Sequence, residues 1–172
     1  MFRFDCYMEE WACAYKPIQH LREEGERRFF RVDDEMRLNE FLQHFIGIPP
    51  GQPVCGIVTH LEGTADVPKR FDSQVVKFLF LQSAPDQTDF HAQADAKAAC
   101  HEHAWKFLVY LHRDVDRLAR TDRTHPLAHL DLHNVQYDML GPITSANWFC
   151  QILTLTAPQY APSCFSEADY IE

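Results

Sequence analysis

A long helical pattern from about Thr88 to Arg120 constrains the fold of this chain more than any other feature. Apolar side chains recur along it at three- and four-residue steps, which is the spacing of one helix face. That face consists of Ala94, Ala98, His101, Trp105, Leu108, Leu111, Val115 and Leu118. Thr88 can cap the first turn. With a rise of 1.5 Å per residue the helix would span on the order of 50 Å, so we expect it to lie across a whole sheet.

Two strand-like segments precede this helix, Val54 to Glu62 and Gln74 to Gln82. The second is apolar on both faces over most of its length, which is typical of a strand in the middle of a sheet. The link between them, Thr64 to Asp72, contains Pro68 and several charges. This composition predicts an exposed hairpin loop.

Two more strand-like segments follow the helix, Leu130 to Met139 and Asn147 to Thr156, with Gly141-Pro142 as the expected turn between them. Two hairpins separated by one long helix predict an α+β fold with an antiparallel-rich sheet. We expect the helix to pack on strands 75–81 and 149–155. The helix residues expected at this contact are Trp105, Leu108 and Val115.

In the N-terminal part, the helical spacing of apolar residues predicts a helix from about Asp5 to Leu21, although Pro17 would kink or end it. Its first apolar residues also alternate as in a strand, at Phe2, Phe4, Cys6 and Met8. An aromatic stripe at four-residue spacing is formed by Tyr7, Trp11 and Tyr15. This stripe is either core packed on the sheet or a face that binds a partner.

A short strand and a second helix follow. Phe29 to Val32 is rich in side chains that favour strands. Asp33 or Asp34 can cap a helix whose apolar face reaches Phe45. The fold expected overall is therefore α+β: N-terminal helices, then two hairpins packed against one long helix.

Length and composition favour one domain over residues 1–157 and an irregular tail over residues 158–172. The tail contains Pro158 and Pro162, yet it keeps several apolar side chains. These candidate oligomer or partner contacts are Tyr160, Phe165, Tyr170 and Ile171. Either the tail docks on a neighbouring copy, or it wraps its own domain and covers the sheet.

The charge balance excludes some partners. Acidic residues exceed basic ones by 25 to 16, and the net charge is -9. Such a chain lacks the electrostatic driving force for nucleic acid and is repelled by anionic lipid. Its six cysteines are scattered without a C-x-x-C pair, which fits reduced thiols, and no apolar run is long enough to span a bilayer. We therefore expect a cytoplasmic protein.

Catalytic and cofactor motifs are missing from the sequence. It holds no G-x-S-x-G elbow, no S-x-x-K and no glycine-rich phosphate loop. The densest set of metal-ligand residue types is Cys100-His101-Glu102-His103. On a helix His101 and His103 point about 200° apart, so they cannot share one ion. We expect no cofactor, no metal site and no enzymatic activity.

The order of elements resembles the tail-terminator and tail-completion proteins of long-tailed bacteriophages, including small proteins carried by prophage-like elements. The resemblance rests on the hairpin over 54–82, the helix over 88–120, Gly141-Pro142-Ile143 and the final strand over 147–156. It implies a structural assembly protein that forms a homo-oligomeric ring in a virion or tail-like particle. A binding or adaptor module and a metal-dependent enzyme are the alternative hypotheses.

Overall fold

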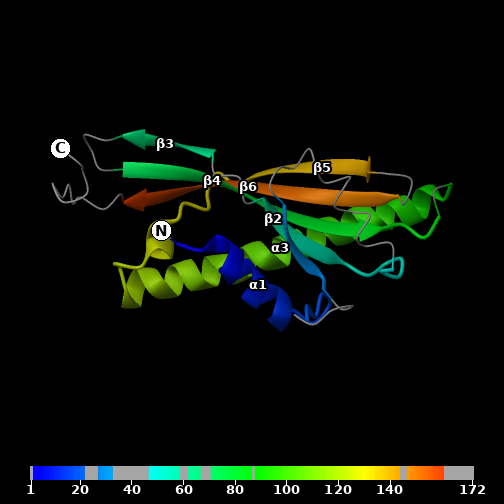
Figure 1. The fold of residues 1–172 in the computed structure, drawn as a ribbon, viewed down its shortest axis with the longest axis horizontal. Coiled ribbons are helices and arrows are strands. Elements are labelled where there is room, and N and C mark those ends of the chain that lie inside the picture. The colour runs from blue at the N-terminus through cyan, green and yellow to red at the C-terminus, as the bar shows by residue number, and fades with distance from the viewer. Residues whose placement is uncertain are drawn as a thin grey trace, which may run out of the picture.

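The computed structural model describes residues 2–21, 27–32, 47–58, 62–66, 71–86, 88–143 and 147–160. The described helices are α1 (Phe4–Ala14), α3 (Phe90–Thr121) and the short 3-10 helix η3 (Pro126–His129). The strands are β1 (Phe29–Val32), β2 (Val54–Val58), β3 (Glu62–Asp66), β4 (Phe71–Ser83), β5 (Gln136–Ile143) and β6 (Trp148–Tyr160). Figure 1 shows α1 and α3 together on one side of the sheet.

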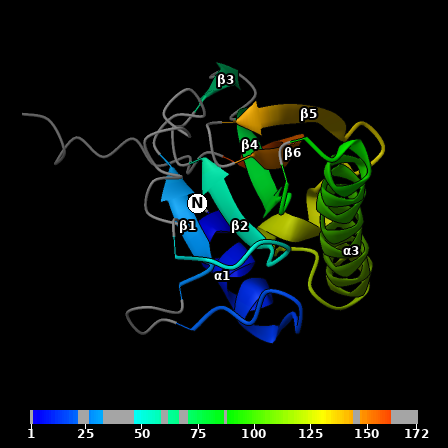
Figure 2. The same ribbon diagram turned by 90° about the vertical axis from the view of Figure 1, so that its right-hand side faces the viewer.

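The strands form one sheet in the order β1-β2-β4-β6-β5, and β3 also pairs with β4. The pairing of β1 with β2 is parallel, and all other pairings among the described strands are antiparallel. α3 runs along the sheet and contacts β4 and β6 (Figures 1 and 2). The predicted α+β fold with an antiparallel-rich sheet and one long packed helix is confirmed.

β4 and β6 are the long central strands, with 13 residues each. They pair along their whole length, from Phe71 opposite Tyr160 to Ser83 opposite Trp148. At the Phe71 end β3 lies beside β4, and at the Ser83 end β2 lies beside β4 while β5 lies beside β6. The sheet is therefore wide at one end and narrow at the other.

The face of α3 that meets the sheet differs from the predicted one. Its buried residues are Ala96, Cys100, Ala104, Phe107, Leu111 and Asp114. Most of the predicted face is wrong by about 100°, one residue of helical rotation, and Trp105 is 60% exposed. Leu111 was also predicted on this face, and it is buried. Small side chains at the first three buried positions let the helix backbone approach the strands. Leu108 and Val115 are half-buried beside this core rather than central to it.

Several predicted boundaries are also wrong. Asp89, not Thr88, caps α3, because its Oδ1 accepts from the N–H groups of His91 at 2.8 Å and Ala92 at 3.2 Å. α1 ends at Ala14 rather than Leu21. Most of the predicted loop from Thr64 to Asp72 belongs to strands, because β3 extends to position 66 and β4 starts at position 71. The second predicted helix, after Asp34, lies outside the described residues.

The last hairpin also differs from expectation. η3 ends at His129, a loop occupies positions 130–135 of the segment predicted as strand from Leu130, and β5 begins only at Gln136. β5 then continues through Gly141 and Pro142, where the predicted turn was wrong. An irregularity in the pairing falls there instead, and Gly141 adopts a φ of +134°, which favours glycine.

The C-terminal strand runs further than predicted. β6 includes Pro158 and ends at Tyr160, so the first three residues of the predicted irregular tail are strand. Among the described strands, only β4 pairs with β6 at this end. A proline is tolerated there, because an edge strand can lack one N–H without losing a ladder bond. Residues 161–172 lie outside the described part of the chain.

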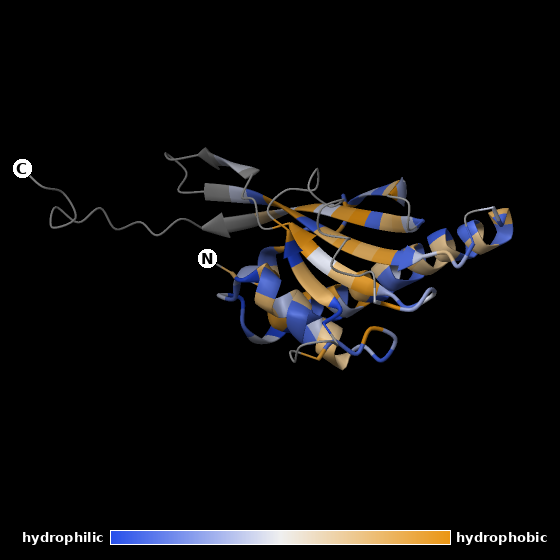
Figure 3. Cartoon of the chain, turned by 45° about the vertical axis from the view of Figure 1, so that its right-hand side comes forward, coloured by the Kyte–Doolittle hydropathy of each residue, from blue (hydrophilic) through white to orange (hydrophobic). Residues whose placement is uncertain are grey.

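The main hydrophobic core lies between the sheet and the two helices. Its fully buried large side chains include Met8, Phe78, Phe80, Phe107 and Leu111. Trp11 is buried among them, and Tyr7 and Tyr15 pack against the same core. The aromatic stripe of α1 is therefore core, as the first of the two hypotheses held. Figure 3 shows the apolar residues concentrated along the central strands.

Candidate partner-binding site

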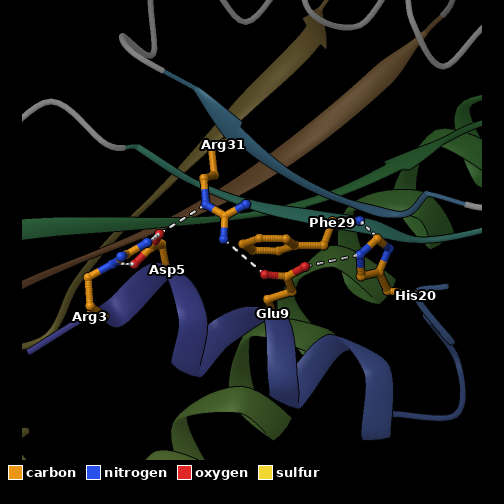
Figure 4. A network of polar contacts seen from close by, with 6 residues as sticks. All are labelled: Arg3, Asp5, Glu9, His20, Phe29 and Arg31. Carbon is orange, nitrogen blue, oxygen red and sulfur yellow. Dashed lines mark hydrogen bonds and ion pairs between the residues drawn. The ribbon is translucent and has the colours of Figure 1, made fainter. Parts of the chain in front are cut away.

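A polar network joins α1 to β1 (Figure 4). Arg31 of β1 donates from Nε to Asp5 at 3.0 Å and from Nη2 to Glu9 at 2.9 Å. Arg3 donates to the same Asp5 carboxylate from two nitrogens, at 2.8 and 2.6 Å. Because every carboxylate in this network is bound by a guanidinium, its chemistry is that of a structural clamp rather than of an acid–base pair.

His20 completes this network from the loop after α1. Its Nδ1 accepts from the backbone N–H groups of Arg28 at 3.0 Å and Phe29 at 3.3 Å. A nitrogen that accepts two N–H groups carries no proton, so the ring hydrogen resides on Nε2, which lies 3.8 Å from Glu9 Oε1. His20 is buried and fixes the start of β1 against α1.

The network predicts a specific acid sensitivity. The hydrogen bond from Arg3 holds the pKa of Asp5 well below its usual range. A carboxyl group whose folded pKa is depressed stabilises the fold above its unfolded pKa, and this stabilisation is lost as the pH falls. We expect Asp5→Asn to lower the free energy of unfolding at pH 7 by about 1 kcal/mol and to flatten its fall between about pH 4 and pH 2.

Urea titrations across this pH range measure the effect. Asp95→Asn, at an exposed position of α3, controls for the loss of one negative charge. A variant Asp5→Asn whose unfolding free energy falls as steeply below pH 4 as that of the original chain would contradict the assignment.

An apolar concavity lined by described residues lies between α3 and the segment leading into β5. It has a volume of about 410 Å³. α3 contributes His101, Ala104, Trp105, Leu108, Val109 and His112. The opposite side is formed by Leu132, His133, Val135, Tyr137 and Leu153. We call this concavity the α3–β5 groove.

Large side chains at the rim of the groove are unusually exposed. Trp105 is 60% exposed, Val109 53% and Tyr137 65%. β5 continues this surface, because Met139, which lies on the same face of the strand as Tyr137, is also an exposed large apolar residue. Contiguous exposed apolar surface of this kind marks a binding site more often than a random surface does.

β5 also offers its backbone. Among the described strands it pairs only with β6, so it is an edge strand of the sheet. An edge strand presents unpaired N–H and C=O groups, to which an extended segment of another chain can pair. Apolar side chains and an open strand edge therefore occur together at one site.

Three histidines line the groove, but they do not form a metal site. His101 Nδ1 lies 3.3 Å from Gln151 Oε1, and its ring packs edge-on to Tyr137 at 5.8 Å. His112 Nδ1 is 3.6 Å from Asp116. Among the residues that the structure describes, no three His, Cys, Asp or Glu side chains are grouped so that they could hold a metal ion.

The densest set of metal-ligand residue types, at positions 100–103, is dispersed as the helical geometry predicts. Cys100 is buried and donates to the carbonyl of Phe149 at 3.4 Å. His101 faces β5, while His103 faces α1 and lies 3.0 Å from the Tyr15 hydroxyl. Burial raises the pKa of the Cys100 thiol to about 12, so this cysteine is not a nucleophile near neutral pH.

A second, more polar pocket of about 650 Å³ lies between the N-terminal end of α1, α3 and η3. Asp114 is buried in its wall and accepts from the Tyr7 hydroxyl at 3.0 Å. Burial, together with the Asp114 charge, raises the pKa of Tyr7, so the phenol stays protonated. Arg117 lies 3.4 Å from the same carboxylate. The Tyr7 hydroxyl and the Arg117 guanidinium therefore satisfy the buried Asp114 side chain.

Of the sequence-predicted contact residues, only Tyr160 belongs to the described part of the chain. Tyr160 lies at the end of β6, opposite Phe71 of β4. Phe165, Tyr170 and Ile171 lie outside the described residues. The groove residues are not predicted from the sequence, because the apolar spacing of α3 assigns Trp105 to the core. A signal in the sequence is that Trp105 shares its helix face with the polar side chains of His101 and His112.

No helix among the described residues is long and apolar enough to cross a membrane. Comparisons with protein-family models, with curated proteins and with solved structures give no match for this chain. Among the described residues, the α3–β5 groove and the edge of β5 are the surface features that indicate a binding function.

Proposed function

We propose that this chain is a structural assembly protein that binds further copies of itself through the α3–β5 groove and the edge of β5. In this proposal it acts as a ring-forming terminator or connector of a phage-type tail, within a virion or tail-like particle. The observation that carries the proposal is the exposed apolar surface that Trp105, Val109 and Tyr137 form beside an open strand edge.

The chemistry of this surface favours a protein partner. Trp and Tyr are the residues that most often dominate the energetics of protein interfaces, because they bury much area at little loss of side-chain entropy. An apolar groove of about 410 Å³ admits several side chains of a partner. The net charge of -9 disfavours nucleic acid and anionic lipid as alternative occupants.

A ring is supported by the asymmetry of the fold. The groove and β5 lie at the wide end of the sheet, while β6 ends at Tyr160 at the narrow end. When a surface at one end binds a different surface of the next copy, the contact is heterologous and closes into a ring if the rotation allows. The order of elements, which resembles tail-terminator proteins, agrees with this arrangement.

Native mass spectrometry of the full chain tests the proposal. We expect oligomers larger than a dimer, and we expect Trp105→Ala combined with Tyr137→Ala to weaken assembly by about 30-fold, since a pair of interface anchors contributes about 2 kcal/mol or more. Lys106→Ala, which lies next to Trp105 but outside the groove, is the matched control.

Two outcomes would contradict it. A full chain that stays monomeric up to about 100 µM would favour the alternative, an adaptor module that binds a different protein in the groove. Oligomers that the double variant leaves unchanged would show that assembly uses another surface.

A further inference from the structure

We propose that residues 161–172 of one copy occupy the α3–β5 groove of the next copy. This inference rests on the proposed function and names the segment that fills the binding surface. No described residue fills the α3–β5 groove. The side chains of residues 161–172 match its chemistry.

The composition of the segment complements the groove. Residues 161–172 contain the apolar side chains Phe165, Tyr170 and Ile171. They also contain the acids Glu167, Asp169 and Glu172, with no lysine or arginine. Among the described residues that line the groove none carries a carboxylate, and three are histidines. An apolar segment with negative charge therefore meets no charge of its own sign on the groove lining.

The path of the chain favours a neighbour's groove over its own. Leu153 lines the groove and lies opposite Tyr137. From there β6 carries the chain from position 153 to position 160, seven steps of roughly 3.3 Å, or roughly 23 Å away from its own groove. A return would require a reversal of direction. Continued outward, twelve residues reach up to roughly 40 Å, enough to meet an adjacent copy.

Native cysteine chemistry can test this assignment in the full chain. Cys164 lies inside the segment, and Cys13 is the exposed cysteine among the described residues. In a Cys13→Ser background, Val109→Cys places a thiol at the groove rim. We expect a short bismaleimide to join Cys164 to the substituted position 109 between chains, seen as a ladder of dimers and larger species on a denaturing gel.

The matched control is Lys106→Cys in the same background, because Lys106 is exposed on α3 but does not line the groove. We expect at least fivefold less cross-linked product from it. Adding Cys164→Ser to the Val109→Cys chain should abolish the ladder. In the chain with native cysteines, Phe165→Ala, Tyr170→Ala and Ile171→Ala together should weaken assembly about as much as the groove variants, roughly 30-fold.

The outcomes separate this inference from the proposed function. If the chain forms oligomers but position 109 cross-links no better than position 106, the inference fails and the assembly function stands. If the full chain is monomeric, the assembly function fails. If Cys164 links to position 109 only within one chain, the segment covers its own groove and the inference is overturned.

Discussion

Phe107→Ala is expected to lower the free energy of unfolding by about 3–5 kcal/mol, which is the range for deleting a buried aromatic ring. Phe107 has no exposed surface, and its ring meets those of Phe78 at 4.7 Å, Trp11 at 5.1 Å and Phe80 at 5.6 Å. It therefore joins α3 to both α1 and β4. Removing it leaves a cavity that none of these three elements can close without losing contacts to the others.

Chemical denaturation of the two variants Phe107→Ala and Trp105→Ala measures this effect with an internal control. Trp105 lies two positions away on the same helix but is largely exposed, so its removal should change stability by less than about 1 kcal/mol. If Trp105→Ala proved the more destabilising of the two, the helix face assigned to the sheet would be wrong.

His20→Ala is expected to lower the free energy of unfolding by about 2–4 kcal/mol, because two backbone N–H groups lose their acceptor and each such loss costs about 1–3 kcal/mol. These groups belong to Arg28 and Phe29, at the entrance to β1. The ring is buried, so a cavity adds to the effect.

Two isosteric replacements sharpen this prediction. Asparagine places its side-chain oxygen close to the position of Nδ1, whereas glutamine places it nearer to that of Nε2. We therefore expect His20→Asn to recover much of the stability lost in His20→Ala, and His20→Gln to recover little. His91→Ala, at an exposed position of α3, is the neutral control. Equal stabilities for the asparagine and glutamine variants would argue against the Nδ1 assignment.

The fold was predictable where one local pattern dominated. The apolar segment from Gln74 to Gln82 predicted a central strand, and β4 lies between β2 and β6. The long helix was also evident, but not its rotation. Trp105, Leu108 and Val115 repeat at helical spacing just as Ala104, Phe107 and Leu111 do. Judged by hydrophobicity, the face of α3 with Trp105 is the one expected to be buried. In the structure the face with Ala104 and Cys100 is buried instead, because small side chains let the helix pack closely on the strands.

The candidate site was less predictable than the fold, because it depends on contacts between distant segments. Tyr137 and Trp105 are far apart in sequence and meet at one groove only because β5 pairs with β6 beneath α3. The sequence Gly141-Pro142 is typical of a turn and therefore predicts that the strand ends before it. In the structure these two residues lie within β5. The spacing of residues in the sequence cannot predict that these two side chains are neighbours, because their proximity depends on the order of strands in the sheet.

The long pairing of β4 with β6 also has a mechanical consequence. Their ladder runs from Phe71 opposite Tyr160 to Ser83 opposite Trp148, and antiparallel hydrogen bonds lie perpendicular to the strands. A pull on the chain beyond Tyr160, directed along β6, loads these bonds in shear, so they must break together rather than one after another. Copies tethered through this segment would therefore withstand tension along the strand axis and yield far more easily to a sideways force that peels β6 from its end.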